Sequence, residues 1–178
     1  HNIPVTQTVM GYSRIKKDHS HYAGQIGGLG GKNTNNLAKE TDLAIAVGTK
    51  LADFTTGSWA NFENENFKLV SINVSRFDAN KHLAQAVVGD AKVSLDELSL
   101  VLGNWKAEDE WNNKSQKELQ EWDKHIDKES APTNQEIPSY VQAVGAIYRN
   151  SDPTDIAVTA AGGLVGEVAQ VWRPRELN

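Results

Sequence analysis

Two continuous apolar runs constrain the fold of this chain more than any other feature. They are DLAIAVG at residues 42–48 and KLVSINV at residues 68–74, and a shorter run, AVVG, follows at residues 86–89. Apolar runs without polar alternation are typical of strands in a parallel sheet that helices cover on both faces. Helix-forming segments separate these runs. The sequence therefore predicts an α/β fold, with a doubly wound parallel sheet and helices on both faces.

The remaining segments of this predicted unit lie on either side of these runs. PVTQT at residues 4–8 is a short strand candidate, because β-branched residues follow a proline. The polar, glycine-rich residues 11–33 are expected to form a long loop, and TNNLAKETD then forms a helix. Asp90 is a good N-cap for the helix in AKVSLDELSLVLG, which Gly103 ends. Residues 1–103 are thus predicted to be a central α/β domain.

The composition changes at Asn104, where a charged segment begins. Residues 104–138 are predicted to be a helical linker, which ends in the proline-punctuated stretch APTNQEIP. Its apolar residues share one helical stripe, and we expect this stripe to dock on a core. The stripe consists of Trp111, Leu119, Trp122 and Ile126.

Residues 139–178 are predicted to be the truncated start of a second α/β domain. SYVQAVGAIYRNS is helical in pattern, DIAVTAA is a strand candidate, and two glycines lead into the amphipathic stretch GLVGEVAQVW. Such a unit buries too little surface to offset the entropy of ordering it, so we expect it to pack on the central domain or on a second copy of the chain. The expected contact residues are Val141, Val144, Ile147, Leu164, Val168 and Trp172.

The composition excludes several classes of protein. A net charge of −5 argues against a nucleic-acid partner, and no apolar run approaches the length of a membrane span. The absence of cysteine excludes disulfides, thiolate metal sites and a cysteine nucleophile. The start, HNIPVTQTV, has no features of a signal peptide and is expected to lie inside a longer sequence. We therefore expect a cytoplasmic protein.

Three short motifs invite a functional interpretation. GQIGGLGGKN lacks the third glycine of a dinucleotide fingerprint, because Asn33 stands in that position, and a structural loop is the favoured interpretation. His19 and His21 lie two residues apart in a polar loop without further ligands at helical spacing, which favours solvated side chains over a metal site. In GDAK, Ala91 replaces the glycine of a G-D-G metal motif, so Asp90 is better explained as a helix cap.

The order of segments resembles a known family. Residues 4–51, with the glycine set Gly24, Gly27 and Gly30 and the strand DLAIAVGTKL, resemble the opening of the central domain of thiamine-diphosphate enzymes of the acetolactate synthase group. KLVSINVSRFDANKHLAQAVVGDAKVSLDELSLVLG resembles the end of that domain. Within the group, DFTTGSW and SINVSRFDANKH are similar to a member that opens a cyclic diketone by hydrolysis of a C–C bond. The tail DIAVTAAGGLVGEVAQVW resembles the start of that member's diphosphate-binding domain.

This resemblance implies that the catalytic groups lie in other domains of a longer chain. The parent enzyme would use thiamine diphosphate and Mg²⁺, with an activating glutamate before His1 and a G-D-G motif after Asn178. It would be a homo-oligomer, and the partners of this segment would be the missing N-terminal and C-terminal domains. The resemblance places Gly162, Gly163 and Leu164 near the diphosphate, through backbone N–H groups. The segment itself is expected to be scaffolding, to bind no cofactor on its own and to have no catalytic residue.

Three alternatives remain open at this stage. The chain could belong to an acetolactate synthase-like lyase, since DFTTGSW is a single short motif. It could be a nucleotide-binding module for FAD or ADP that uses residues 27–31, Gly48 and Thr49. Against this, Asn73 and Ser75 stand where nucleotide-binding relatives often carry acidic residues for a ribose. It could also be an assembly domain that dimerises through the stripe on residues 111–126.

Overall fold

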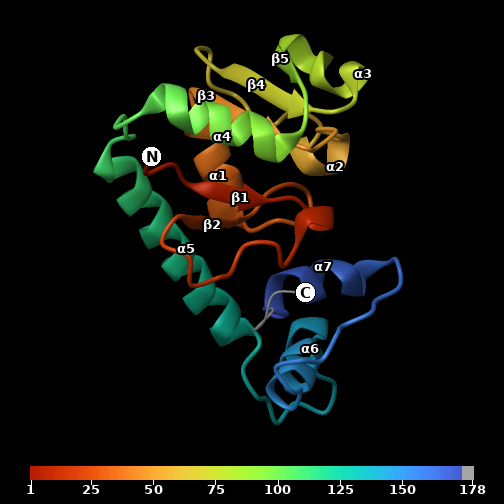
Figure 1. Ribbon diagram of the computed structural model, residues 1–178. Coiled ribbons are helices and arrows are strands. Elements are labelled where there is room, and N and C mark those ends of the chain that lie inside the picture. Colours follow the sequence, from red (N-terminus) through yellow and green to blue (C-terminus); the bar gives the residue numbers. More distant parts are fainter. Residues whose placement is uncertain (174–178) are drawn as a thin grey trace.

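The computed structural model describes residues 1–173 (Figure 1). In chain order the elements are β1 (Val5–Gln7), η1 (Val9–Gly11), β2 (Tyr22–Gln25), α1 (Lys32–Glu40), β3 (Leu43–Val47), α2 (Asp53–Thr56), β4 (Lys68–Asn73), α3 (Arg76–Ala79), η2 (Lys81–Leu83), β5 (Gln85–Val88), α4 (Ala91–Leu102), α5 (Asp109–Glu129), α6 (Tyr140–Arg149) and α7 (Gly163–Val171). The mixed α/β class and the helices at residues 32–40, 91–102, 140–149 and 163–171 agree with the sequence-based predictions.

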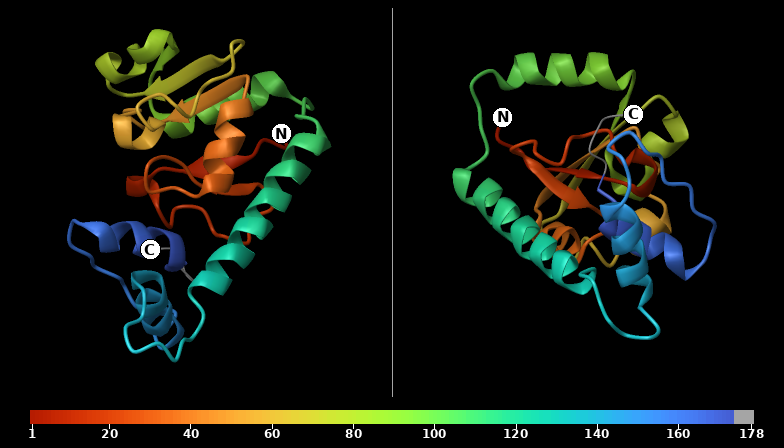
Figure 2. Two further views of the ribbon diagram at one scale, coloured as in Figure 1. Left: turned by 180° about the vertical axis from the view of Figure 1, so that it is seen from behind. Right: turned by 90° about the horizontal axis from the view of Figure 1, so that it is seen from below.

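The strands form two small parallel sheets rather than one doubly wound sheet. β1 pairs with β2, and a second sheet has the order β3-β4-β5. In the described residues the strand order never reverses, so the predicted doubly wound topology is wrong in that respect. Helices do lie on both sides: α4 lies in front of β3 and β4 in Figure 1, and the reverse view in Figure 2 places α1 on the other side.

The apolar runs are less buried than a doubly covered sheet requires. In β3, Leu43 is 50% exposed and Val47 is 38% exposed, and Val88 of β5 is 53% exposed. Among the three strands of this sheet, only β4 is largely buried, because it is the central strand. The apolar runs therefore predicted the positions of the strands correctly. The prediction that helices cover both faces of every strand was wrong for β3 and β5.

The segment at residues 22–25 is a strand that the sequence analysis placed in a loop. β2 pairs with β1 in parallel, with Val5 opposite Tyr22 and Gln7 opposite Gln25. All four residues of β2 are buried. The glycine and polar residues of YAGQ have a low propensity for strands. Pairing with β1 therefore stabilises this strand, although its own sequence does not favour one.

The predicted strand at residues 155–160 is absent. This segment has no regular secondary structure, and Ile156 and Val158 are 73% and 91% exposed. A strand needs a neighbour to accept and donate its backbone hydrogen bonds, and no described strand pairs with this segment. The helices before and after it, α6 and α7, pack on one another instead.

Among residues 1–173, two separate groups of buried apolar residues form clusters. The first, beside the three-stranded sheet, has buried Ala46, Leu51 and Leu69. The second joins α5, α6 and α7 through buried Ile126, Val144 and Val171. Helix α5 connects the two parts, since it also packs on α1 and β2 and runs along the side of the molecule in Figure 1.

Helix α5 docks through the predicted stripe. Leu119 and Ile126 are buried, and Trp122 packs against the second cluster. Trp111 is partly buried, and the Lys114 ammonium lies 5.7 Å from the centroid of its ring. The linker is therefore a packed part of the structure.

The C-terminal segment packs on the rest of the chain, as expected. Val144 belongs to the second cluster, Val141 and Val168 pack against it, and the Trp172 carbonyl oxygen accepts a hydrogen bond from the Tyr12 hydroxyl. Two expected contacts are wrong: Ile147 and Leu164 are 63% and 44% exposed. They lie on the outer faces of α6 and α7, which the helical pattern alone could not distinguish from the packed faces.

Asp90 caps α4, as the sequence predicts, with its Oδ1 accepting a hydrogen bond from the Val93 N–H at 3.0 Å. We expect Asp90→Ala to lower the free energy of unfolding by about 1 kcal/mol, because one N–H at the helix start loses its partner. Chemical denaturation followed by circular dichroism measures this change. Asp90→Ser retains a capping oxygen and should remain close to the wild type. Equal losses in both variants would contradict a capping role.

No helix in the described part of the chain is both long enough and apolar enough to cross a membrane.

Candidate functional site

The glycine-rich loop after β2 is a tightly packed structural turn. Gly24 and Gly27 have φ values of +98° and +107°, in the region that favours glycine. A Cβ on Gly27 would lie 2.2 Å from the Phe54 carbonyl oxygen, and a Cβ on Gly30 would lie 2.2 Å from the Gln25 carbonyl oxygen. These backbone contacts leave no room for any side chain. They explain the glycine spacing without a ligand.

Asn35 holds this loop with both ends of its side-chain amide. Its Oδ1 accepts from the Gly27 N–H at 2.9 Å, and its Nδ2 donates to the Gly27 carbonyl oxygen at 3.0 Å. Asn61 Nδ2 donates to the same Oδ1 at 3.1 Å. The sequence analysis missed both asparagines, although for Asn35 the polar run KNTNN at the start of a helix is a signal for such contacts.

The positions that would contact a nucleotide are used for loop structure. Asn73 Nδ2 donates to the Thr49 carbonyl oxygen at 3.2 Å, and Asn73 Oδ1 accepts from the Ser75 N–H at 2.9 Å. Ser75 Oγ in turn caps α3 by accepting from the Asp78 N–H. Gly48, at φ +63°, has open space around it. The polar side chains at the end of β4 therefore already have hydrogen-bond partners within the chain.

The three proposed diphosphate contacts lie at the exposed N-terminus of α7. Gly162 is the N-cap at φ +125° without a capping side chain, and a Cβ there would meet nothing within 4 Å. Gly163 and Leu164 are also exposed. The first turn of this helix therefore has room for an anion at its backbone N–H groups. A preceding strand, which the resemblance expects, is absent.

The residues present do not provide a site for Mg²⁺. The described residues contain no group of three or more potential metal ligands. His19 and His21 lie close together, with ring centroids 5.7 Å apart, but their nitrogens contact other groups. His21 Nε2 is 3.0 Å from Asn2 Oδ1, and His21 Nδ1 is 2.9 Å from Ser20 Oγ. The chain's described residues thus fit at most the diphosphate of the cofactor, not its metal ion.

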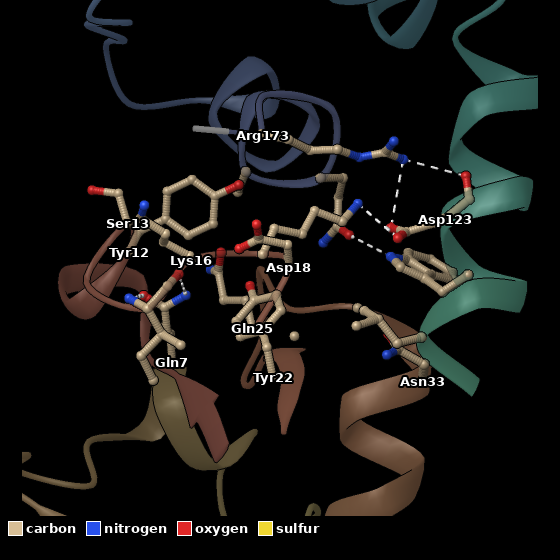
Figure 3. A pocket seen from close by; sticks show the side chains of 18 of the residues that line it. Gln7, Tyr12, Ser13, Lys16, Asp18, Tyr22, Gln25, Asn33, Asp123 and Arg173 are labelled. Carbon is tan, nitrogen blue, oxygen red and sulfur yellow. Dashed lines mark hydrogen bonds and ion pairs between the residues drawn. The ribbon is translucent and has the colours of Figure 1, made fainter. Parts of the chain in front are cut away.

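A cavity of about 400 Å³ lies where the two-stranded sheet meets the C-terminal segment (Figure 3). Gln7, Gln25 and Asn33 lie on one side, at the ends of β1 and β2 and the start of α1. Asp123 of α5 and Arg173 after α7 lie on the other sides. The cavity therefore depends on contacts between segments far apart in the sequence, and no motif predicted it.

Ion pairs between α5 and its neighbours close one wall of this cavity. Lys17 Nζ lies 2.7 Å from Asp123 Oδ2, and Arg173 Nη1 lies 2.7 Å from Asp127 Oδ1. Arg173 Nη2 is also 3.6 Å from Asp123 Oδ1. Burial lowers the pKa of Lys17, although its hydrogen bond to Asp123 opposes the shift. Positive and negative groups in this wall largely neutralise one another.

Two tyrosines, the buried Tyr22 and the partly buried Tyr12, form aromatic walls. The Tyr12 hydroxyl donates a hydrogen bond to the Trp172 carbonyl oxygen, which joins the N-terminal loop to the C-terminal segment. Burial raises the pKa values of Tyr12 and Tyr22, so both hydroxyls stay protonated at neutral pH. With Ile15, Leu119 and Trp122, these rings make part of the cavity wall apolar, while the rest is polar.

Two side chains that line the cavity have buried polar atoms without hydrogen-bond partners among the described residues. They are Oε1 and Nε2 of Gln25 and Oδ1 of Asn33. The neighbouring Gln7 differs: its amide accepts from the Arg14 N–H at 2.9 Å and contacts the Ile15 carbonyl oxygen at 3.4 Å. A buried polar group without a partner costs about 1–3 kcal/mol. Such groups are rare enough to need an explanation.

Comparison with known proteins identifies the chain's relatives. The family described as "Thiamine pyrophosphate enzyme, central domain" matches residues 1–98. The chain is 34% identical over 194 residues to the 3D-(3,5/4)-trihydroxycyclohexane-1,2-dione hydrolase of Clostridium perfringens, covering 96% of this chain and 30% of that protein. It is 31% identical over 201 residues to the hydrolase of that name from Clostridium tetani, covering 99% and 31%. The protein of that name from Bacillus anthracis is 32% identical over 204 residues, covering 99% and 31%.

Two conclusions follow from these matches. The chain spans about 30% of the length of the curated relatives that it matches, so it corresponds to one part of them. The family match covers more than half of the chain and includes the glycine loop and both apolar runs. The chain therefore belongs to the thiamine pyrophosphate enzymes and contains the central domain of that family.

Proposed function

We propose that this chain is the central portion of a thiamine-diphosphate-dependent enzyme that hydrolyses a C–C bond of 3D-(3,5/4)-trihydroxycyclohexane-1,2-dione in inositol catabolism. The observation that carries this proposal is the extent of the similarity. It reaches across 96–99% of the chain, beyond the central domain, in relatives that share that name. The identity of 31–34% supports the substrate class by descent.

Within that enzyme the part played by this chain is scaffolding. The Gly24–Gly31 loop, Asn73 and Ser75 all make contacts that hold the fold, and none of them is left for chemistry. When bound, thiamine diphosphate supplies the carbanion chemistry of the reaction. This chain would contribute at most the backbone N–H groups of Gly162, Gly163 and Leu164 to the diphosphate. We propose no catalytic residue in it.

The longer protein would carry the rest of the machinery. We propose that the activating glutamate and the Mg²⁺ ligands lie in the domains outside this sequence, and that the enzyme is a homo-oligomer in the cytoplasm, as the resemblance implies. The division at residues 1–103, 104–138 and 139–178 remains our proposal for the organisation of the chain.

The chain alone should not turn over the diketone. With saturating thiamine diphosphate and Mg²⁺, we expect ring opening by the purified chain to equal that of a buffer control, because its described residues hold no metal site and the proposed activating glutamate lies outside this sequence. Loss of the diketone's ultraviolet absorbance measures this directly. Turnover above the buffer control would contradict the scaffolding role.

A chimera tests whether this chain fits the hydrolase as its central scaffold. Replacing the matching third of the Clostridium perfringens hydrolase with this chain should yield an enzyme that still assembles and opens the ring. The matched control carries the same region of an acetolactate synthase, whose contacts with the hydrolase's other domains differ, and it should not assemble into an active enzyme. A folded and assembled chimera with this chain that lacks ring opening would contradict the assignment.

A further inference from the structure

One side-chain amide joins three distant segments of the chain. Gln170 lies in the last turn of α7, and its Nε2 donates to the Leu29 carbonyl oxygen at 2.6 Å. Its Oε1 accepts from the Trp122 Nε1–H at 3.2 Å. Leu29 belongs to the glycine-rich loop after β2, and Trp122 belongs to α5. Because the nitrogen and the oxygen of this amide each have a partner, its orientation is fixed.

Close packing of small residues supports the same connection. A Cβ on Gly166 would lie 3.7 Å from Leu29 Cδ2, so the Leu29 side chain lies against α7 about one helical turn before Gln170. A Cβ on Gly31 would lie 2.9 Å from Trp122 Nε1, so the indole ring lies directly on the loop. A larger side chain at Gly31 would push away the ring that holds the amide. The glycine-rich loop therefore supports α7.

This support determines the direction in which α7 points. The loop contacts α7 at Gly166 and Gln170, and two contacts on one face of a helix fix the direction of its axis. Gly162 lies about 12 Å along the axis from Gln170. A tilt of about 10° at Gln170 would therefore displace the N–H groups of residues 162–164 by about 2 Å. Hydrogen bonds from N–H groups form at about 2.7–3.2 Å, so such a tilt would break their contacts with an anion.

We propose that Gln170 is a positioning residue for the cofactor diphosphate. By holding α7 against the glycine-rich loop, it directs the N–H groups of residues 162–164 toward the place where the diphosphate binds in the longer enzyme. This inference rests on the proposed function, which assigns those three residues to the diphosphate. It also gives the loop a function, because the loop carries the carbonyl oxygen of Leu29 that holds the helix.

Two matched substitutions separate this role from a general effect on stability. Gln170→Glu keeps the length of the side chain and the acceptor for Trp122 Nε1–H, but a carboxylate cannot donate to the Leu29 carbonyl oxygen. Gln116→Glu is the control. Gln116 Nε2 donates to the Tyr22 carbonyl oxygen at 2.8 Å and so joins α5 to β2. Each substitution removes one bond from an amide to a backbone carbonyl, and only the first bond holds α7.

Hydrogen exchange in the 178-residue chain without cofactor measures how firmly α7 is held. Gln170→Glu should speed exchange in residues 163–171 by about tenfold, because the helix loses its hydrogen bond to the loop. Gln116→Glu should leave exchange in those residues unchanged. If Gln170→Glu exchanged like the wild type, the amide would not hold the helix and the proposal would be overturned.

The chimera with the Clostridium perfringens hydrolase gives a readout that a purely structural role would not change. In calorimetric titration with excess Mg²⁺, Gln170→Glu should weaken binding of thiamine diphosphate by about tenfold. Its kcat at saturating cofactor should remain within about twofold of the unsubstituted chimera, since the bound diphosphate then lies in the same place. Gln116→Glu should change neither value. Unchanged affinity in Gln170→Glu, or equal losses in both variants, would overturn the positioning role.

A different result contradicts the proposed function. An assembled chimera that binds thiamine diphosphate without opening the ring would contradict the substrate assignment, and the affinities of the two variants would still decide the role of Gln170. An assembled chimera that does not bind the cofactor would contradict the diphosphate assignment at residues 162–164 and overturn the positioning role with it.

Discussion

Gly27→Ala should lower the free energy of unfolding by about 3 kcal/mol or more, a large effect for a single methyl group. The new Cβ would lie 2.2 Å from the Phe54 carbonyl oxygen, and that oxygen already accepts a hydrogen bond from the Gly28 N–H at 2.7 Å. Backbone rather than a flexible side chain must therefore move. Urea denaturation followed by circular dichroism measures the loss.

Two other glycines provide matched controls. Gly48 has a similarly left-handed φ of +63° but open space, so Gly48→Ala should cost only the conformational strain of about 1–2 kcal/mol. At Gly28 the nearest atom to a Cβ is 3.6 Å away, and Gly28→Ala should be within about 0.5 kcal/mol of the wild type. If Gly27→Ala cost no more than Gly48→Ala, close packing of the loop would not be the reason for its glycine.

Ile126→Ala should destabilise the C-terminal part of the chain by about 2–5 kcal/mol, because a large buried side chain is removed from a small cluster. Ile126 is 6% exposed and packs with Val144 and Val171. Hydrogen exchange measured by mass spectrometry should show that residues 139–173 lose protection. The strands β3 and β4 should keep theirs, since the cluster around Leu69 is separate. In the wild type, the same segment should open before those strands.

The reciprocal substitution is the control for this selectivity. Leu69→Ala should expose β3 and β4 and leave α6 and α7 protected, because Leu69 belongs to the other cluster. Val101→Ala changes a residue that is 85% exposed and should alter neither region. Equal loss of protection throughout the chain in both core variants would mean that residues 1–173 unfold as one cooperative unit and that the boundary near Pro138 is wrong.

The sequence by itself determined the elements whose cause is local. The Asp90 cap, the end of α4 at Gly103 and the stripe on α5 are all readable because capping and helical periodicity act within a few residues. The apolar runs predict β3 and β4 correctly, because a short continuous run of apolar residues is typical of a strand in a parallel sheet. The family resemblance also follows from the sequence, through the order and spacing of these motifs.

The tertiary structure decided the features that depend on distant partners. YAGQ becomes β2 because Val5 and Gln7 lie beside it, whereas the more apolar DIAVTAA stays irregular because no described strand is placed to pair with it. The cavity requires that Tyr12, Gln25, Asp123 and Arg173 meet, although the first and the last of them lie near opposite ends of the described chain. A strand pairing or a cavity is a property of two or more segments together, so the hydrogen bonds and ion pairs that create it are absent from any local pattern.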